Sequence, residues 1–198
     1  MKMHLRVCLC VLAAFALVTP GLAVTYKSSD GSLALSARTI DVSAKADSVI
    51  ASGKAHVHFS DPVTKTTLEA DAGKIVVVVF SSKTGKSAVG RTSIKSADLS
   101  GPVTMVYTFP DSSGGISKIT ATADSADFDG TSNVAHLTGH VKIVNENPAV
   151  FAEPAVMVGD KATVNLSPNL GAADYRFRVE SSPGVSTITV TPKPKEAQ

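Results

Sequence analysis

The stretch that decides the fold is residues 123–143, which read ADSADFDGTSNVAHLTGHVKI. An alanine-rich segment containing Phe128 precedes a turn at Gly130 to Asn133, and an alternating segment follows that turn. Gly139 then opens a second alternating run. Because side chains on a β-strand point alternately to opposite faces, this order predicts strands with one apolar and one polar face.

The same alternation recurs along the chain from Val24 onward. No segment there repeats apolar residues at the helical spacing, whereas short alternating runs stand between clusters of Gly, Pro, Asn, Asp and Ser. The six apolar residues of Ile75 to Phe80 predict a strand that is covered on both faces or lies at a seam. The sequence therefore predicts an all-β protein, with further strands over 55–59, 103–109, 119–123, 162–166, 175–179 and 186–190.

Three glycines, Gly53, Gly101 and Gly139, each begin an alternating segment, and they lie 48 and 38 residues apart. A glycine at the entrance of a strand permits a sharp bend or a φ value that other residues avoid. Successive strands can then fold over at similar positions. The repeat unit is therefore predicted to be a bent hairpin rung.

Residues 124–143, with a weaker copy around Gly53, resemble the OstA-like domain family of periplasmic lipopolysaccharide transport proteins of the A and C type. The resemblance covers most of residues 40–166, and Pro102 stands where a polar residue is usual. It implies an antiparallel, open β-jelly roll that holds the acyl chains of lipopolysaccharide along a hydrophobic seam. It also implies end-to-end stacking with further copies, and with inner- and outer-membrane transport components of the same β-jelly-roll type.

Elementary energetics agrees with a lipid-binding interior. Burial of an acyl chain contributes about 0.8 kcal/mol per CH₂, so a 12-carbon chain represents roughly 10 kcal/mol that only a long apolar trough can supply. We expect the trough to be lined by inward side chains of three repeats, with small Ala and Val residues leaving room for the ligand. These side chains are Ala55, Val57, Phe59, Val103, Met105, Tyr107, Val141 and Ile143.

Residues 1–23 have the features of a secretory signal peptide. Lys2 and Arg6 precede an apolar run, Val7 to Val18, and small residues favour cleavage after Ala23. The run is shorter than the ~20 residues of a transmembrane helix, and an uncleaved anchor is the alternative. We expect the cleaved protein to reside in the periplasm. The expected organisation of the whole chain is a signal peptide at 1–23, an OstA-like β-jelly-roll domain at 24–191 and a polar tail at 192–198.

Composition and charge exclude several functions. Of the 198 residues, 43% are hydrophobic and 18% are charged, which fits one domain with a substantial core. The 19 basic residues exceed the 17 acidic ones only through Lys2 and Arg6. The mature chain therefore lacks the basic excess that binding to a nucleic-acid backbone requires. Cys8 and Cys10 lie in the signal peptide, so no disulfide is expected in the mature protein.

Motifs that could suggest other chemistry have simpler structural interpretations. Ser81 to Ser87 imitates a phosphate-binding loop, but Phe80 replaces its first glycine. His56 and His58 share one face of a strand, yet a metal site would need a third ligand from another strand. The carboxylates at 124, 127 and 129 lack the spacing of an EF-hand. With no catalytic motif either, we expect no enzyme, no metal and no cofactor.

Two functions stay open on the sequence alone. One is a non-enzymatic periplasmic carrier of lipopolysaccharide or a related acylated lipid, and the other is an exported structural or adhesive β-repeat protein without a lipid ligand. An open apolar interior would favour the carrier. Uncharged edges at Ser32 to Ser36 and Ser186 to Val190 predict head-to-tail association, unless Pro192 and the lysines after it cap the second edge.

Overall fold

The computed structural model describes residues 23–43, 47–80, 94–111, 113–167, 170 and 174–194. Residues 1–22 of the predicted signal peptide lie outside the described residues. The segment Ser81 to Ser87, which resembles a phosphate-binding loop, also lies outside them. Within the described part, no helix is long and apolar enough to cross a membrane. The strands are β1 (Val24–Lys27), β2 (Leu33–Ala37), β3 (Thr39–Ser43), β4 (Ser48–Asp61), β5 (Thr66–Val79), β6 (Ile94–Pro110), β7 (Ile116–Asp129), β8 (Val134–Glu146), β9 (Phe151–Asn165), β10 (Phe177–Glu180) and β11 (Thr187–Pro192).

These strands form one antiparallel sheet that follows the chain order almost throughout. The main path is β1-β2-β4-β5-β6-β7-β8-β9-β10, while β3 pairs with β4 and β11 pairs with β9. The first and last strands of the path do not pair with each other, so the sheet stays open. The prediction of an all-β, open, antiparallel β-jelly roll is confirmed.

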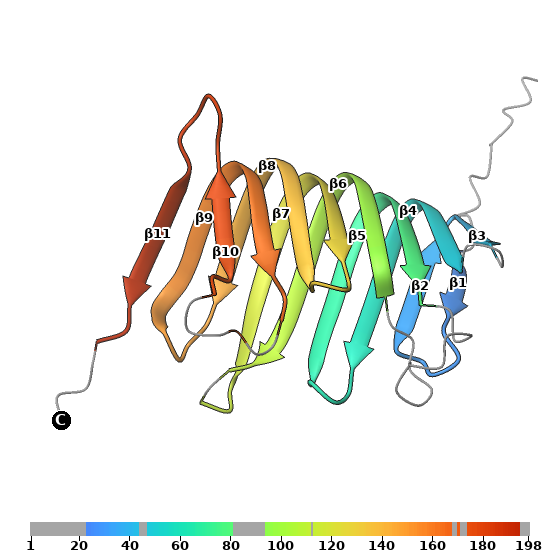
Figure 1. Cartoon of the computed structure of the whole chain (residues 1–198), viewed down its shortest axis with the longest axis horizontal. Coiled ribbons are helices and arrows are strands. Elements are labelled where there is room, and N and C mark those ends of the chain that lie inside the picture. The colour runs from blue at the N-terminus through green and yellow to red at the C-terminus, as the bar shows by residue number, and fades with distance from the viewer. Residues whose placement is uncertain are drawn as a thin grey trace, which may run out of the picture.

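Each long strand from β4 to β9 bends and runs through two facing layers (Figure 1). The bends lie along one long side of the molecule, and the turns that join these long strands lie along the other side, which we call the seam. Layer 1 holds β1, β2, β11 and residues 55–61, 66–72, 103–110, 116–123, 141–146 and 151–159. Layer 2 holds β3, β10 and residues 48–52, 74–79, 94–100, 125–129, 134–138 and 161–165.

Glycines occupy three of the bends, as the sequence predicts. Gly53, Gly101 and Gly139 have φ values of +81°, +90° and +80°, and the strand pairing shifts register beside each of them. A side chain at such a φ value is strained, so these positions favour glycine. The following residue also has a positive φ in two bends, but the ring of Pro102 prevents this in the third. The bend of β6 therefore depends on Gly101 alone for its left-handed backbone.

The inner faces of the two layers form the hydrophobic core. In β5, Ile75 and Val77 are fully buried, whereas Val76 and Val78 on the outer face are only half-buried. The expectation that this run is covered on both faces is therefore wrong. The second alternative fits, because the strand ends at the seam (Figure 1). Period-two alternation thus continues through a run that the sequence shows as uniformly apolar.

The edges of the sheet differ from expectation at the N-terminal end. The segment Leu33 to Ser36 pairs with β1 on one side and with β4 on the other, so it is not an edge. The edges at this end are β1 in layer 1 and β3 in layer 2, and those at the other end are β11 and β10. The expected edge at Ser186 to Val190 lies mostly within β11, which pairs with β9 and with no other described strand.

Candidate functional site

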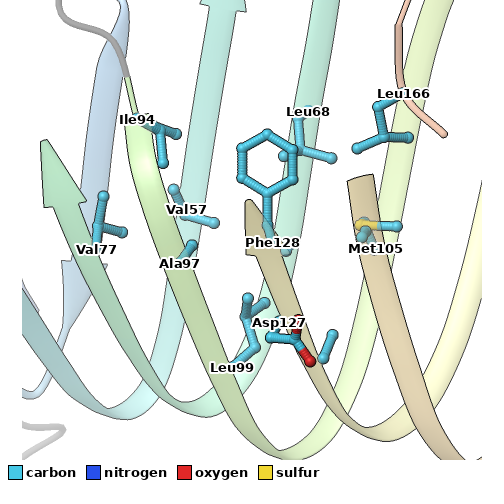
Figure 2. A pocket seen from close by; sticks show the side chains of 13 residues that line it. Val57, Leu68, Val77, Ile94, Ala97, Leu99, Met105, Asp127, Phe128 and Leu166 are labelled. Carbon is cyan, nitrogen blue, oxygen red and sulfur yellow. The ribbon is translucent and has the colours of Figure 1, made fainter. Parts of the chain in front are cut away.

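An apolar cavity lies between the two layers, and Figure 2 shows side chains from both layers turned toward it. Layer 1 contributes Met105 from β6, and layer 2 contributes Val77 from β5 and Phe128 from β7. The complete lining is Val57, Leu68, Ala70, Val77, Ile94, Ala97, Leu99, Met105, Ala126, Asp127, Phe128, Ala135 and Leu166. Twelve of these thirteen residues are apolar, and the side chain of Asp127 belongs to an exposed position of β7.

The cavity is small in this conformation. Its volume is ≈ 20 Å³, and a site of roughly 10–15 Å³ on this measure holds one water molecule. An acyl chain therefore enters only if the layers separate or if side chains rearrange. Met105 has the flexible, unbranched side chain that can rearrange most readily, and the alanines at 70, 97, 126 and 135 offer little bulk to displace.

The eight side chains expected to line a trough all lie on the inner face of layer 1. Seven of them are buried, and Phe59 is half-buried against the core. Only Val57 and Met105 border the cavity, however. The other members belong to the core or pack against it without bordering the cavity. They are Ala55, Phe59, Val103, Tyr107, Val141 and Ile143.

The expected set omits the opposite wall of the cavity, which layer 2 supplies. Ala97 and Leu99 lie two positions apart on β6, and Ala126 and Phe128 do so on β7. This spacing of two is the signal that could have identified them. The predicted residues all lie on one side of the glycine in each strand, whereas the bend turns both halves of the strand toward the same interior.

Four residues tie the two layers together at the seam, and we call them the latch: Tyr107, Phe109, Leu166 and Arg176. The Tyr107 hydroxyl donates a hydrogen bond to the backbone carbonyl of Leu166 over 2.7 Å. Phe109 stacks on Tyr107 with ring centroids 5.3 Å apart, and the Arg176 guanidinium lies 4.7 Å from the Phe109 centroid. Arg176 also donates to two backbone carbonyls at the end of β9, over 2.9 and 3.0 Å.

Burial of the latch shifts the pKa values of its two ionisable groups. It raises the pKa of the Tyr107 hydroxyl and lowers the pKa of the Arg176 guanidinium. The tyrosine therefore remains a protonated donor at neutral pH. The strand expected over 175–179 begins only at Phe177, although the backbone carbonyl of Arg176 still accepts a hydrogen bond from the N–H of Asn165.

We expect Tyr107→Phe to lower the free energy of unfolding by about 1–3 kcal/mol, because it leaves the carbonyl of Leu166 without its buried donor. Urea denaturation measures this change. Tyr175→Phe is the matched control, since Tyr175 is 57% exposed, and its effect should stay within about 0.5 kcal/mol. Equal stability of the two variants would show that the bond between the layers contributes nothing.

The interior also opens at both ends of the sheet. At one end, Ile188 of β11 lies opposite buried Met157, yet its side chain is 61% exposed. At the other end, Val42 of β3 lies opposite buried Val49 and is 62% exposed. Residues that face each other across paired strands share one face of a sheet. The apolar inner surface therefore continues to both edges without a cover among the described residues.

Histidines on the outer face pair with carboxylates of the neighbouring strand. His56 and Asp71 lie 2.9 Å apart, and His140 and Asp124 lie 2.8 Å apart. Hydrogen bonding to Asp124 raises the pKa of His140. No group of three potential metal ligands occurs among the described residues. Asp129 accepts hydrogen bonds from Thr131 and Ser132, so this carboxylate caps a turn, as its position before a strand predicts.

Comparison with known proteins identifies the architecture. No protein-family model and no curated protein sequence matches this chain. Among solved structures, LptH from Pseudomonas aeruginosa is similar. It is described as the LptA-homologous periplasmic component of the conserved lipopolysaccharide transport device. The match has a TM-score of 0.51 at 12% identity and covers 82% of this chain and 95% of LptH. This chain therefore shares the open antiparallel β-jelly-roll fold of LptH.

Proposed function

We propose that this protein is a non-enzymatic carrier of lipopolysaccharide or a related acylated lipid, which it binds between its two layers. The observation that supports the proposal most directly is the apolar inner surface, which borders the seam and reaches both ends of an open sheet. Such a surface suits a ligand with long acyl chains, since each buried CH₂ contributes about 0.8 kcal/mol. The fold shared with a component of a lipopolysaccharide transport device supports the same assignment.

The proposed acyl-chain contacts combine the expected residues with the cavity wall of layer 2. On layer 1 they are Ala55, Val57, Phe59, Val103, Met105, Tyr107, Val141 and Ile143. On layer 2 they are Val77, Ile94, Ala97, Leu99, Phe128 and Leu166. In this proposal the acyl chains enter through the seam, where the latch bridges the two layers, and the head group stays in solvent.

The proposal also includes location and partners. The protein acts in the periplasm after cleavage of the signal peptide behind Ala23. A second copy stacks against its exposed end strands, and membrane-bound transport components of the same β-jelly-roll type stack in the same way. Exposed edge strands favour this, because their unpaired backbone groups can extend a sheet into a neighbouring molecule.

One observation favours the second candidate, an exported structural β-repeat protein. The cavity of ≈ 20 Å³ leaves no free space for an acyl chain in this conformation, and a filled interior is what a purely structural module would need. The two candidates differ in whether the layers separate when lipid is present.

Lipid extraction separates the two functions. The protein is exported in a bacterial host, purified without detergent and extracted with organic solvent, and the extract is analysed by mass spectrometry. A carrier should yield acylated lipid at a near-stoichiometric level, and added lipopolysaccharide should restore binding to the delipidated protein. Absence of lipid in both experiments would leave the structural candidate.

A further inference from the structure

Two polar side chains in the apolar inner face of layer 1 each hold a buried oxygen without a hydrogen-bond partner among the described residues. Ser117 of β7 is fully buried and Asn145 of β8 is 6% exposed. Neither the Ser117 Oγ nor the Asn145 Oδ1 has a partner among the described residues. Buried polar atoms are nearly always hydrogen-bonded in folded proteins, so two unpaired oxygens on one wall require an explanation.

The strand register places these two side chains next to each other. Asn145 lies opposite Ile119, and Ser117 is two positions before Ile119 on the same strand. Ser117 and Asn145 are therefore diagonal neighbours on one face, with Cα atoms about 7–8 Å apart in a regular antiparallel pair. Their surroundings are otherwise apolar, because Ser117 lies opposite buried Phe109 and Asn145 lies opposite buried Ala155.

Their place in the strands locates the pair at the seam. Ser117 is the second residue of β7, and Asn145 is the penultimate residue of β8. Both strand ends adjoin hairpin turns on the seam side (Figure 1). In the proposed function this is the side where an acyl chain leaves the interior and joins its head group.

We propose that Ser117 and Asn145 form a polar subsite that recognises a hydroxyl group near the head end of a bound acyl chain. This inference rests on the proposed lipid-carrier function. The Asn145 Oδ1 can only accept a hydrogen bond, while the Ser117 hydroxyl can donate or accept one. A ligand hydroxyl donates to Asn145 and accepts from Ser117, so one group satisfies both side chains. An unsubstituted acyl chain satisfies neither of them.

The subsite makes the carrier selective for hydroxylated acyl chains. A site with buried polar groups discriminates against a ligand that leaves those groups unpaired. We expect the protein to bind 3-hydroxytetradecanoate about tenfold more tightly than tetradecanoate, which is the usual effect of one or two buried hydrogen bonds. Competition against a fluorescent acyl probe measures both affinities.

Ser117→Ala and Asn145→Leu are expected to abolish this preference and to retain binding of tetradecanoate. Both variants should fold, because each removes a buried oxygen that has no partner among the described residues, and each should raise the melting temperature by about 2–4 °C. Thr122→Ala and Lys142→Ala are matched controls on the same two strands, since these residues face each other on the exposed outer face. The controls should keep the tenfold preference.

The outcomes separate this inference from the proposed function. If tetradecanoate and its 3-hydroxy analogue bind the wild-type protein equally, the subsite is wrong and the lipid carrier stands. A preference that survives in both Ser117→Ala and Asn145→Leu also overturns the subsite, and the two oxygens then serve only to hold internal water. If neither compound binds, the subsite is overturned, whereas the carrier function fails only if lipopolysaccharide does not bind either.

Discussion

Met105→Asp is expected to weaken binding of a fluorescent acyl probe at least about tenfold, whereas Thr104→Asp should change it less than about twofold. Met105 is 4% exposed and borders the cavity. An aspartate there must either carry a buried charge or take up a proton, and both states cost free energy. Thr104 precedes it on β6, and its side chain is exposed on the outer face.

An inward and an outward substitution on β8 can be compared in the same way, here by their effect on the free energy of unfolding. Ile143 is fully buried, so Ile143→Asp should lower the free energy of unfolding by more than about 3 kcal/mol. Lys142 is exposed, and Lys142→Asp should lower it by less than about 1 kcal/mol. Urea denaturation followed by circular dichroism measures both values.

A further variant keeps the binding test independent of a buried charge. Ala97 borders the cavity from layer 2, so Ala97→Leu fills the space between the layers at a cost of about 1–3 kcal/mol. The variant should fold and should bind the probe more weakly than the wild-type protein. Equal binding by folded Met105→Asp, Ala97→Leu and Thr104→Asp would contradict a lipid site between the layers.

The second large effect concerns association. Light scattering over a concentration series should show a mass that rises without a limit, because contact between unlike ends generates a filament and not a closed dimer. Ile188→Lys should reduce this mass to that of the monomer, since it places a charge on an apolar side chain that is 61% exposed at the β11 edge. A constant monomer mass for the wild-type protein at high concentration would refute head-to-tail stacking.

The two ends of the molecule supply internal controls. Val63 is 62% exposed in the turn between β4 and β5, so Val63→Lys adds the same charge away from both ends and should leave association unchanged. Val42→Lys at the β3 edge should block association as Ile188→Lys does. Because each of these two variants retains one intact end, an equimolar mixture should form dimers and nothing larger. Filaments in the mixture would show that the contact does not involve these edges.

Period-two alternation and three glycines allowed much of the fold to be predicted from the sequence. Val141 and Ile143 point inward and Lys142 points outward because neighbouring residues of a strand must face opposite ways. Gly53 and Gly139 mark bends because few other residues adopt their positive φ values. Both features depend on the local backbone alone, so a single segment is enough to reveal them.

The pairing partners of each strand could not be predicted from the sequence of that strand alone. Leu33 to Ser36 has the uncharged alternation of an edge, but β1 pairs along its outer side and the true edges lie elsewhere. An alternating segment shows which of its faces is apolar, and it does not show which segment will pair beside it. Pairing depends on competition among all the strands of the sheet.

In the candidate site, too, one part could be predicted from the sequence and the other part could not. The sequence by itself determined that Val57 and Met105 face an apolar interior, because their alternation fixes the inward face of layer 1. Only the tertiary structure decided what lies opposite them, since the bends bring Val77 and Phe128 to the same cavity. It also decided that the Tyr107 hydroxyl bonds to the carbonyl of Leu166, 59 residues away along the chain. Such contacts form only when the bent sheet brings distant segments together, and no periodicity within either segment encodes them.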